Sequence, residues 1–179
     1  MSSNAFSMGC KQGYAVSEDG IDLEWTAYKT PLKIGVGGKF RELGVTKTYQ
    51  GKTLSELLSG LEFNIDSAST STKNTSRDAK IVKYFFQKMT GGLNITGSIK
   101  EYKQKTLYIE INMNKHTQII PLKAEISGDQ LTANGFIDVF DFGLNESLKG
   151  INKACEKLHE GKTWNDVGVS LKIDLKSGC

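Results

Sequence analysis

The chain has 179 residues, of which 38% are hydrophobic and 24% charged, and its formal net charge is +3. This composition is typical of a folded globular domain with one sizeable core. The small net charge and the lack of a basic stripe interleaved with aromatic residues argue against nucleic-acid binding. No apolar run approaches the ~18 residues that a membrane-spanning helix needs.

The first residues carry little structural signal. We predict a tail over residues 1–20 and a single domain over residues 21–179. The opening MSSNA lacks the basic and apolar regions of a complete signal peptide, although Ser-Asn-Ala resembles the end of a cleavage site. The tail is therefore either the remnant of a removed export signal or a sequence added to the natural protein.

Cys10, Cys155 and Cys179 are the three cysteines, and their spacing matches no zinc-binding pattern. A single disulfide would suit an oxidising compartment, and three reduced thiols would suit the cytosol equally well. If a disulfide forms, we favour Cys10 with Cys155, because Cys179 is the last residue and chain ends are commonly frayed.

Alternation of apolar and polar residues at period two dominates the chain and predicts half-buried β-strands. In chain order, the alternating segments cover residues 21–27, 32–40, 61–65, 93–99, 107–113, 120–126, 131–139 and 167–175. Most are joined by short turn-like segments, which favours antiparallel neighbours. The sequence therefore predicts eight strands.

Three segments have helical periodicity: residues 53–59, 77–89 and 146–160. Thr53 and Glu56 have the spacing of a capping box at the start of the first helix. Gly161 follows the last helix, in a position where glycine commonly ends helices.

Eight strands with one apolar face each can pack as a sandwich or close into a barrel. An eight-stranded barrel is either filled by its own side chains or holds one small ligand. Gly38, Gly97 and Gly135 fall on the inward face, where they either remove side-chain volume or bend the strands. At ~3.3 Å per residue, such strands would enclose a space roughly 25–30 Å long, which a long apolar chain would fit.

Few residues offer catalytic chemistry. Asp66 and Asp78 flank a loop rich in hydroxyl side chains and, with His159, could act as acid and base. Turn bracing and helix capping are the more common uses of such Asp, Ser and Thr residues. Cys155 and His159 lie on one helical face, but two ligands do not make a metal site.

The stretch FNIDSASTSTKNTSRDAKIVKYFF, residues 63–86, resembles the signature of the YceI-like family of bacterial polyisoprenoid-binding proteins. GVGGKF, LNITGSI and ANGFIDVFDFGLN resemble three strands of that family, so that the resemblance covers roughly residues 21–175. It implies an elongated, lipocalin-like antiparallel barrel of eight strands with two or three short helices. It also implies that the barrel holds a long isoprenoid or similar lipid, usually in the periplasm, without catalysis. Phe85 and Phe86 would then lie at or inside the tunnel, with Arg77 and Asp78 bracing the loop at its mouth.

We therefore expect a periplasmic bacterial protein that is not an enzyme and that binds, transports or stores a long-chain lipid. The lipid would be a polyisoprenoid, an isoprenoid quinone or a fatty-acid derivative. We expect no cofactor, no metal and no nucleic acid, with the membrane only as a source of lipid and a homodimer as one option. The residues predicted to line the tunnel are Trp25, Ile34, Val36, Phe40, Phe63, Ile65, Phe85, Phe86, Ile95, Leu107, Ile109, Ile111, Met113, Ile137 and Phe142. Asp66, Arg77 and Asp78 are predicted to brace its mouth. The alternatives are an enzyme on the same barrel that uses Asp66, Asp78 or His159, and a structural or interaction module whose core is filled.

Overall fold

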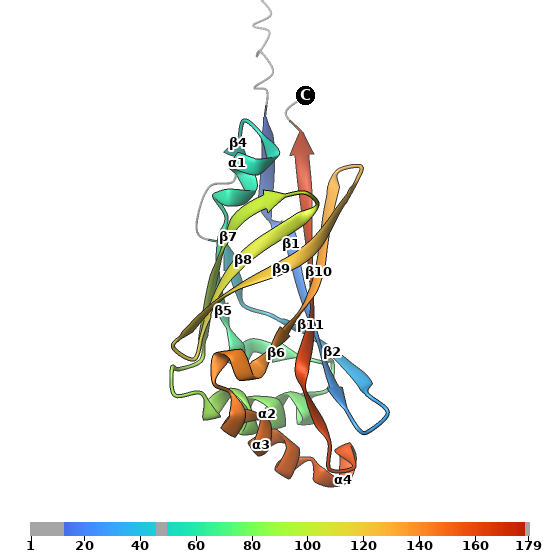
Figure 1. The fold of residues 1–179 in the computed structure, drawn as a ribbon. Coiled ribbons are helices and arrows are strands. Elements are labelled where there is room, and N and C mark those ends of the chain that lie inside the picture. The colour runs from blue at the N-terminus through green and yellow to red at the C-terminus, as the bar shows by residue number, and fades with distance from the viewer. Residues whose placement is uncertain (1–12, 46–49, 178–179) are drawn as a thin grey trace, which may run out of the picture.

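A computed structural model describes residues 13–45 and 50–177, which form a long curled antiparallel sheet with helices at both ends (Figure 1). The strands are β1 (Tyr14–Lys29), β2 (Ile34–Phe40), β3 (Leu43–Val45), β4 (Gln50–Gly51), β5 (Glu62–Asp66), β6 (Thr70–Ser71), β7 (Asn94–Lys103), β8 (Thr106–Met113), β9 (His116–Ser127), β10 (Gln130–Asp138) and β11 (Thr163–Ser177). The helices are α1 (Leu54–Ser59), α2 (Thr75–Tyr84), α3 (Asn145–Ala154) and α4 (Glu156–His159), with short 3-10 helices η1 (Ser67–Ser69), η2 (Phe86–Lys88) and η3 (Val139–Phe142).

The sheet curls until its two ends meet. The strand order is β3-β5-β7-β8-β9-β10-β11-β1-β2-β6, and β4 pairs with β1. Only residues 41–42 separate β2 from β3, and only η1 separates β5 from β6. Phe40 pairs with Thr70 and Leu43 pairs with Ile65, so β2 and β3 together lie along β5 and β6. The predicted antiparallel barrel is confirmed.

All eight predicted strands are present, and the described residues form eleven strands in total. The count differs because bends divide two of the barrel walls into β2 with β3 and β5 with β6, and because β4 is a short addition beside β1. The predicted bounds of the first strand were wrong. β1 begins at Tyr14, so residues 14–20 belong to the sheet and not to a tail. A register shift against β11 between Val16 and Ile21 interrupts the alternation there, which hides the start of the strand in the sequence.

The predicted helices are present with altered ends. At α1, the Thr53 hydroxyl accepts a hydrogen bond from the Glu56 backbone N–H, as a capping box requires. The Glu56 carboxylate accepts from the N–H of Lys52 instead of that of Thr53. The second predicted helix divides into α2 and η2, and the third divides at Cys155 into α3 and α4.

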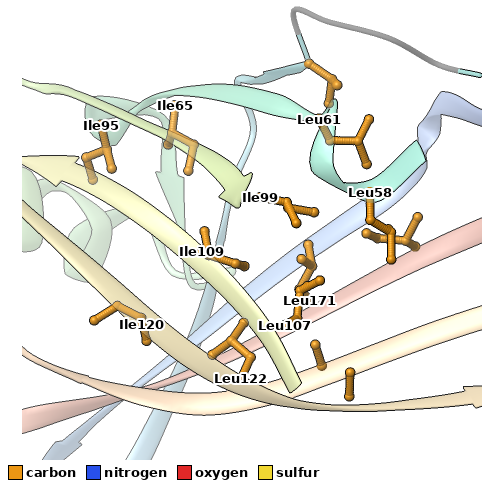
Figure 2. Close-up of a cluster of buried hydrophobic side chains, with 14 of the residues drawn as sticks. Leu58, Leu61, Ile65, Ile95, Ile99, Leu107, Ile109, Ile120, Leu122 and Leu171 are labelled. Atoms are coloured by element: carbon orange, nitrogen blue, oxygen red, sulfur yellow. The ribbon is translucent and has the colours of Figure 1, made fainter. Parts of the chain in front are cut away.

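The two ends of the barrel are closed differently. At one end lies α1 (Figure 1), and its Leu57 and Leu58 are both fully buried. Figure 2 shows Leu58, Leu61, Ile99, Leu107 and Leu122 gathered in the interior near this end. We call this region the packed half. At the other end, α2 and α3 lie across the barrel (Figure 1).

Candidate functional site

The half of the barrel beneath α2 and α3 encloses a cavity of about 220 Å³, which we call the main cavity. Its wall is almost wholly apolar, and it is built from both the sheet and the helices. The lining residues are Leu23, Glu24, Trp25, Ala27, Tyr28, Lys29, Val36, Phe40, Phe63, Ile65, Arg77, Lys80, Ile81, Phe85, Phe86, Ile95, Ile111, Met113, Ile137, Val139, Leu144, Leu148, Ile151, Cys155, His159, Thr163, Trp164, Val167 and Val169. We call this region of the barrel the hollow half.

A chain of aromatic rings runs along the wall of the main cavity. The ring centroids of Trp25 and Phe40 are 6.5 Å apart, those of Phe40 and Phe86 are 6.0 Å apart, and those of Phe86 and Phe85 are 5.2 Å apart. Such spacings are typical of favourable edge-to-face contacts. The pair of phenylalanines at the end of α2 therefore connects the helix to the rings of the sheet.

Two of these rings lie over glycines. Trp25 pairs across the sheet with Gly38, and a Cβ atom added at Gly38 would lie 2.3 Å from Cζ2 of Trp25. Phe63 pairs with Gly97, where an added Cβ would lie 2.1 Å from Cζ of Phe63. Each glycine thus leaves room for the aromatic ring of the neighbouring strand. The inward glycines provide space for side chains, the first of the two roles that the sequence suggested.

Most of the predicted tunnel residues lie on the wall of the main cavity, but several do not. Leu107, Ile109 and Phe142 are buried in the solid core. Ile34, the first residue of β2, is 49% exposed and does not line the cavity. Alternation predicts which face of a strand points inward, but it does not say how far along the barrel the interior is filled.

Apart from Phe85 and Phe86, sequence reasoning missed the part of the wall that the helices supply. Ile81, Leu148, Ile151 and Cys155 line the cavity from α2, α3 and the break before α4. Their helical spacing showed that each helix has an apolar face. What that face covers is a matter of tertiary packing, for which the sequence held no local signal.

A network of hydrogen bonds fixes the loop between β5 and α2. Asp66 caps η1, accepting from the N–H of Ala68 at 2.9 Å. The Asp78 carboxylate accepts from the backbone N–H and the hydroxyl of Thr72, at 2.8 and 2.5 Å. Arg77 donates to the hydroxyl and the carbonyl oxygen of Thr72, at 2.8 and 3.1 Å. The start of α2 is therefore tied to the loop, and the helix carries the two phenylalanines at a fixed position.

The residues of the catalytic alternative do not share one site. His159 lines the main cavity, whereas Asp66 and Asp78 do not, and both carboxylates are engaged in the loop. The His159 Nδ1 atom lies 2.7 Å from the Thr163 hydroxyl, which donates to Asn152. Burial, and then the charge of Lys29, lower the pKa of His159 below its ordinary value.

The described residues bear on the metal question but not on the Cys10–Cys155 disulfide. No group of three or more His, Cys, Asp and Glu side chains that could hold a metal ion occurs within residues 13–45 and 50–177. Cys155 is buried on the cavity wall. Its expected partner Cys10 lies outside the described residues, as does Cys179, so the disulfide stays a prediction.

Basic side chains dominate the charged part of the cavity wall. Lys29, Arg77 and Lys80 all line the main cavity, and we call them the basic rim. The acidic residue on this wall, Glu24, forms an ion pair with Lys39 at 2.9 Å. The basic rim thus brings positively charged side chains to an otherwise apolar wall.

A second, smaller cavity of about 40 Å³ lies towards the packed half. It is lined by Ile21, Leu23, Leu43, Val45, Leu61, Glu62, Phe63, Ile99, Leu171 and Ile173. Leu23 and Phe63 line both cavities. We call these two residues the constriction.

The fold and the main cavity together define a class of protein, a β-barrel whose interior suits an apolar ligand. A model of the YceI-like domain matches residues 14–175, and the chain belongs to this family. No curated protein sequence matches the chain. No helix in the described part of the chain is both long and apolar enough to cross a lipid bilayer.

Solved structures share the fold at low sequence identity. A polyisoprenoid-binding domain from Saccharophagus degradans, implicated in plant cell wall breakdown, matches with a TM-score of 0.64 and 13% identity, over 93% of this chain and 99% of that one. BcnA of Burkholderia cenocepacia matches with a TM-score of 0.60 and 12% identity, over 90% and 99% of the two chains. The YceI protein of Campylobacter jejuni matches with a TM-score of 0.55 and 18% identity, over 79% and 84%.

Proposed function

We propose that this protein binds a long-chain lipid in its main cavity and carries or stores it without catalysing a reaction. The observation that supports this most strongly is an almost wholly apolar cavity of about 220 Å³ inside a barrel that is otherwise well packed. Apolar burial stabilises a bound chain by about 0.8 kcal/mol for each methylene group. Binding of this kind needs few polar contacts, and the wall of the main cavity offers few.

The proposed ligand is a polyisoprenoid, an isoprenoid quinone or a fatty-acid derivative. The structurally similar domain from Saccharophagus degradans is described as polyisoprenoid binding, which favours this class. We place the protein in the periplasm of a bacterium, as its family suggests, where a membrane would supply the lipid.

The basic rim supports an orientation for the ligand. Lys80 is half-buried, and its ammonium group has no hydrogen-bond or ion-pair partner among the described residues. Lys29 lies close enough to His159 for its charge to lower the pKa of that imidazole. A polar or acidic head group at the rim would compensate these charges, while the apolar chain lies along the aromatic rings.

The positions of the candidate catalytic residues favour binding over catalysis. Asp66 and Asp78 hold the loop before α2 by hydrogen bonds, and neither faces the cavity. Of the three residues named for the catalytic alternative, only His159 would contact a substrate in the main cavity. Acid-base chemistry on a lipid would need a second group, and the cavity wall places no free carboxylate beside this histidine.

The test compares two isoleucines on neighbouring strands. Ile111 of β8 lines the main cavity, whereas Ile119 of β9 is 56% exposed on the outside of the barrel. We expect Ile111→Asp to abolish uptake of a fluorescent fatty acid, because it buries a carboxylate in the cavity wall. Ile119→Asp should bind as the unmodified protein does. Uptake by an Ile111→Asp variant with an intact melting transition would contradict the proposal.

A further inference from the structure

The two cavities lie in line along the barrel, and this arrangement bears on the length of the ligand. On β1, Trp25 and Leu23 line the main cavity, and Leu23 and Ile21 line the smaller one. On the paired strand β11, Val169 lines the main cavity and Leu171 the smaller one. Successive inward positions on both strands therefore lead from one cavity to the next.

The constriction lies where the two cavities meet. Phe63 of β5 and Leu23 of β1 are the residues that line both. On β7, Ile95 lines the main cavity, Ile99 lines the smaller one, and the inward position between them is Gly97. The ring of Phe63 covers Gly97, so an aromatic side chain occupies the level at which the two cavities would otherwise join.

We infer that Phe63, with Leu23, limits the length of the apolar chain that the barrel accepts. The inference rests on the proposed function, because it specifies the ligand of the same cavity. A chain that reaches from the basic rim to Phe63 fills the main cavity. Further methylene groups must either displace the ring or remain outside the barrel.

This arrangement predicts that affinity rises with the length of the ligand chain up to a certain length and then levels off. Each methylene group buried in the main cavity should raise affinity by about fourfold. Once the chain meets Phe63, an added methylene group contributes little, and affinity levels off. The smaller cavity of about 40 Å³ would accept the next part of the chain if the ring were absent.

The experiment measures displacement of a fluorescent apolar probe by saturated fatty acids of increasing length. It uses the unmodified protein and the variants Phe63→Ala and Phe40→Ala. Phe40 is the matched control, because it lines the main cavity but not the smaller one. We expect Phe63→Ala to move the plateau to longer chains, with about a fourfold gain for each further methylene group buried. Phe40→Ala should change affinity without moving the plateau.

Leu23→Ala provides a second variant, because it widens the constriction from β1 and leaves the contact between Phe63 and Gly97 in place. It should also move the plateau to longer chains. The inference is wrong if both variants fold, bind fatty acids and keep the plateau of the unmodified protein. If the unmodified protein binds no fatty acid of any length, both the inference and the proposed function fail.

Discussion

The packed half and the hollow half are built from the same long strands, yet only one of them encloses a large cavity. In the packed half, fully buried aliphatic side chains such as Leu107, Leu122 and Leu131 belong to one core cluster. In the hollow half, Trp25 lies over the glycine of the neighbouring strand instead of meeting a side chain there. The comparison shows how a regular barrel keeps space inside: glycines accept the rings along the wall, and helices cover the opening.

The largest effect that we expect concerns stability, and it contrasts a leucine from each half. Leu107→Ala in the packed half should lower the free energy of unfolding by about 2–5 kcal/mol, because it leaves a new cavity among close-packed side chains. Leu148→Ala on α3 should cost less, because Leu148 already borders the main cavity and loses fewer contacts. Urea unfolding of both variants without lipid measures the difference. Equal losses would show that the two halves are packed alike.

A smaller loss should follow from cutting the bonds that hold α2 over the hollow half. Asp78 is 7% exposed and accepts two hydrogen bonds from Thr72. Asp78→Ala leaves those donors without their acceptor and should lower the free energy of unfolding by about 1–3 kcal/mol. Asp129 is exposed, so the Asp129→Ala variant controls for the loss of one negative charge. If Asp78→Ala and Asp129→Ala unfold at the same urea concentration, the network does not stabilise the start of α2.

The hollow half differs from the packed half in the positive charges of the basic rim. A Lys80→Met variant tests whether one of these charges contributes to ligand binding. Lys80→Met should weaken binding of a fatty acid by about two- to fivefold, the effect of one partly exposed ion pair. Binding of the alcohol with the same chain should change less. Lys83→Met, on the same helix but away from the cavity wall, is matched in charge. Equal effects of the two variants on the acid would mean that the rim does not recognise the head group.

The smallest effect concerns pH. Burial and Lys29 lower the pKa of His159 from 6.5, so the folded protein favours the neutral imidazole. Below pH 6.5 the unfolded chain binds the proton more readily, and the stability contributed by neutral His159 is lost as the pH falls through the folded pKa. His159→Gln should therefore lose less stability than the unmodified protein between neutral and mildly acidic pH. If both proteins lose the same amount of stability over this pH range, His159 is not the cause of the loss.

The sequence predicts the strands well because a half-buried strand requires alternation. It does not predict where along the barrel axis the interior is filled and where it is hollow. Leu107 and Ile109 share a strand face with Ile111 and Met113, yet the first two are in the solid core and the last two line the cavity. The difference depends on α1 closing one end and α2 and α3 covering the other. Contacts between segments far apart in the sequence determine this arrangement, and alternation within one strand cannot report it.

The sequence also predicts local polar structure better than tertiary position. The hydroxyl-rich loop, with Asp66, Arg77 and Asp78, has a composition that favours turns and caps, and its bonds in the structure are of that kind. Ile34 has the alternation of an inward residue, but it is the first residue of β2 and lies outside the cavity, where the Ile34 side chain is exposed. Turn and cap propensities depend on a few neighbouring residues in the sequence. The exposure of a side chain depends on which other segments of the fold pack against it.

One measurement tests the central claim most directly: a crystal structure with a long-chain fatty acid that carries bromine at its terminal carbon, located by anomalous scattering. The account predicts the bromine in the main cavity beside Phe63, with the carboxylate at the basic rim. Bromine found only on the outside of the barrel, for instance near exposed Leu32 or Phe136, would contradict the claim that the hollow half holds the lipid.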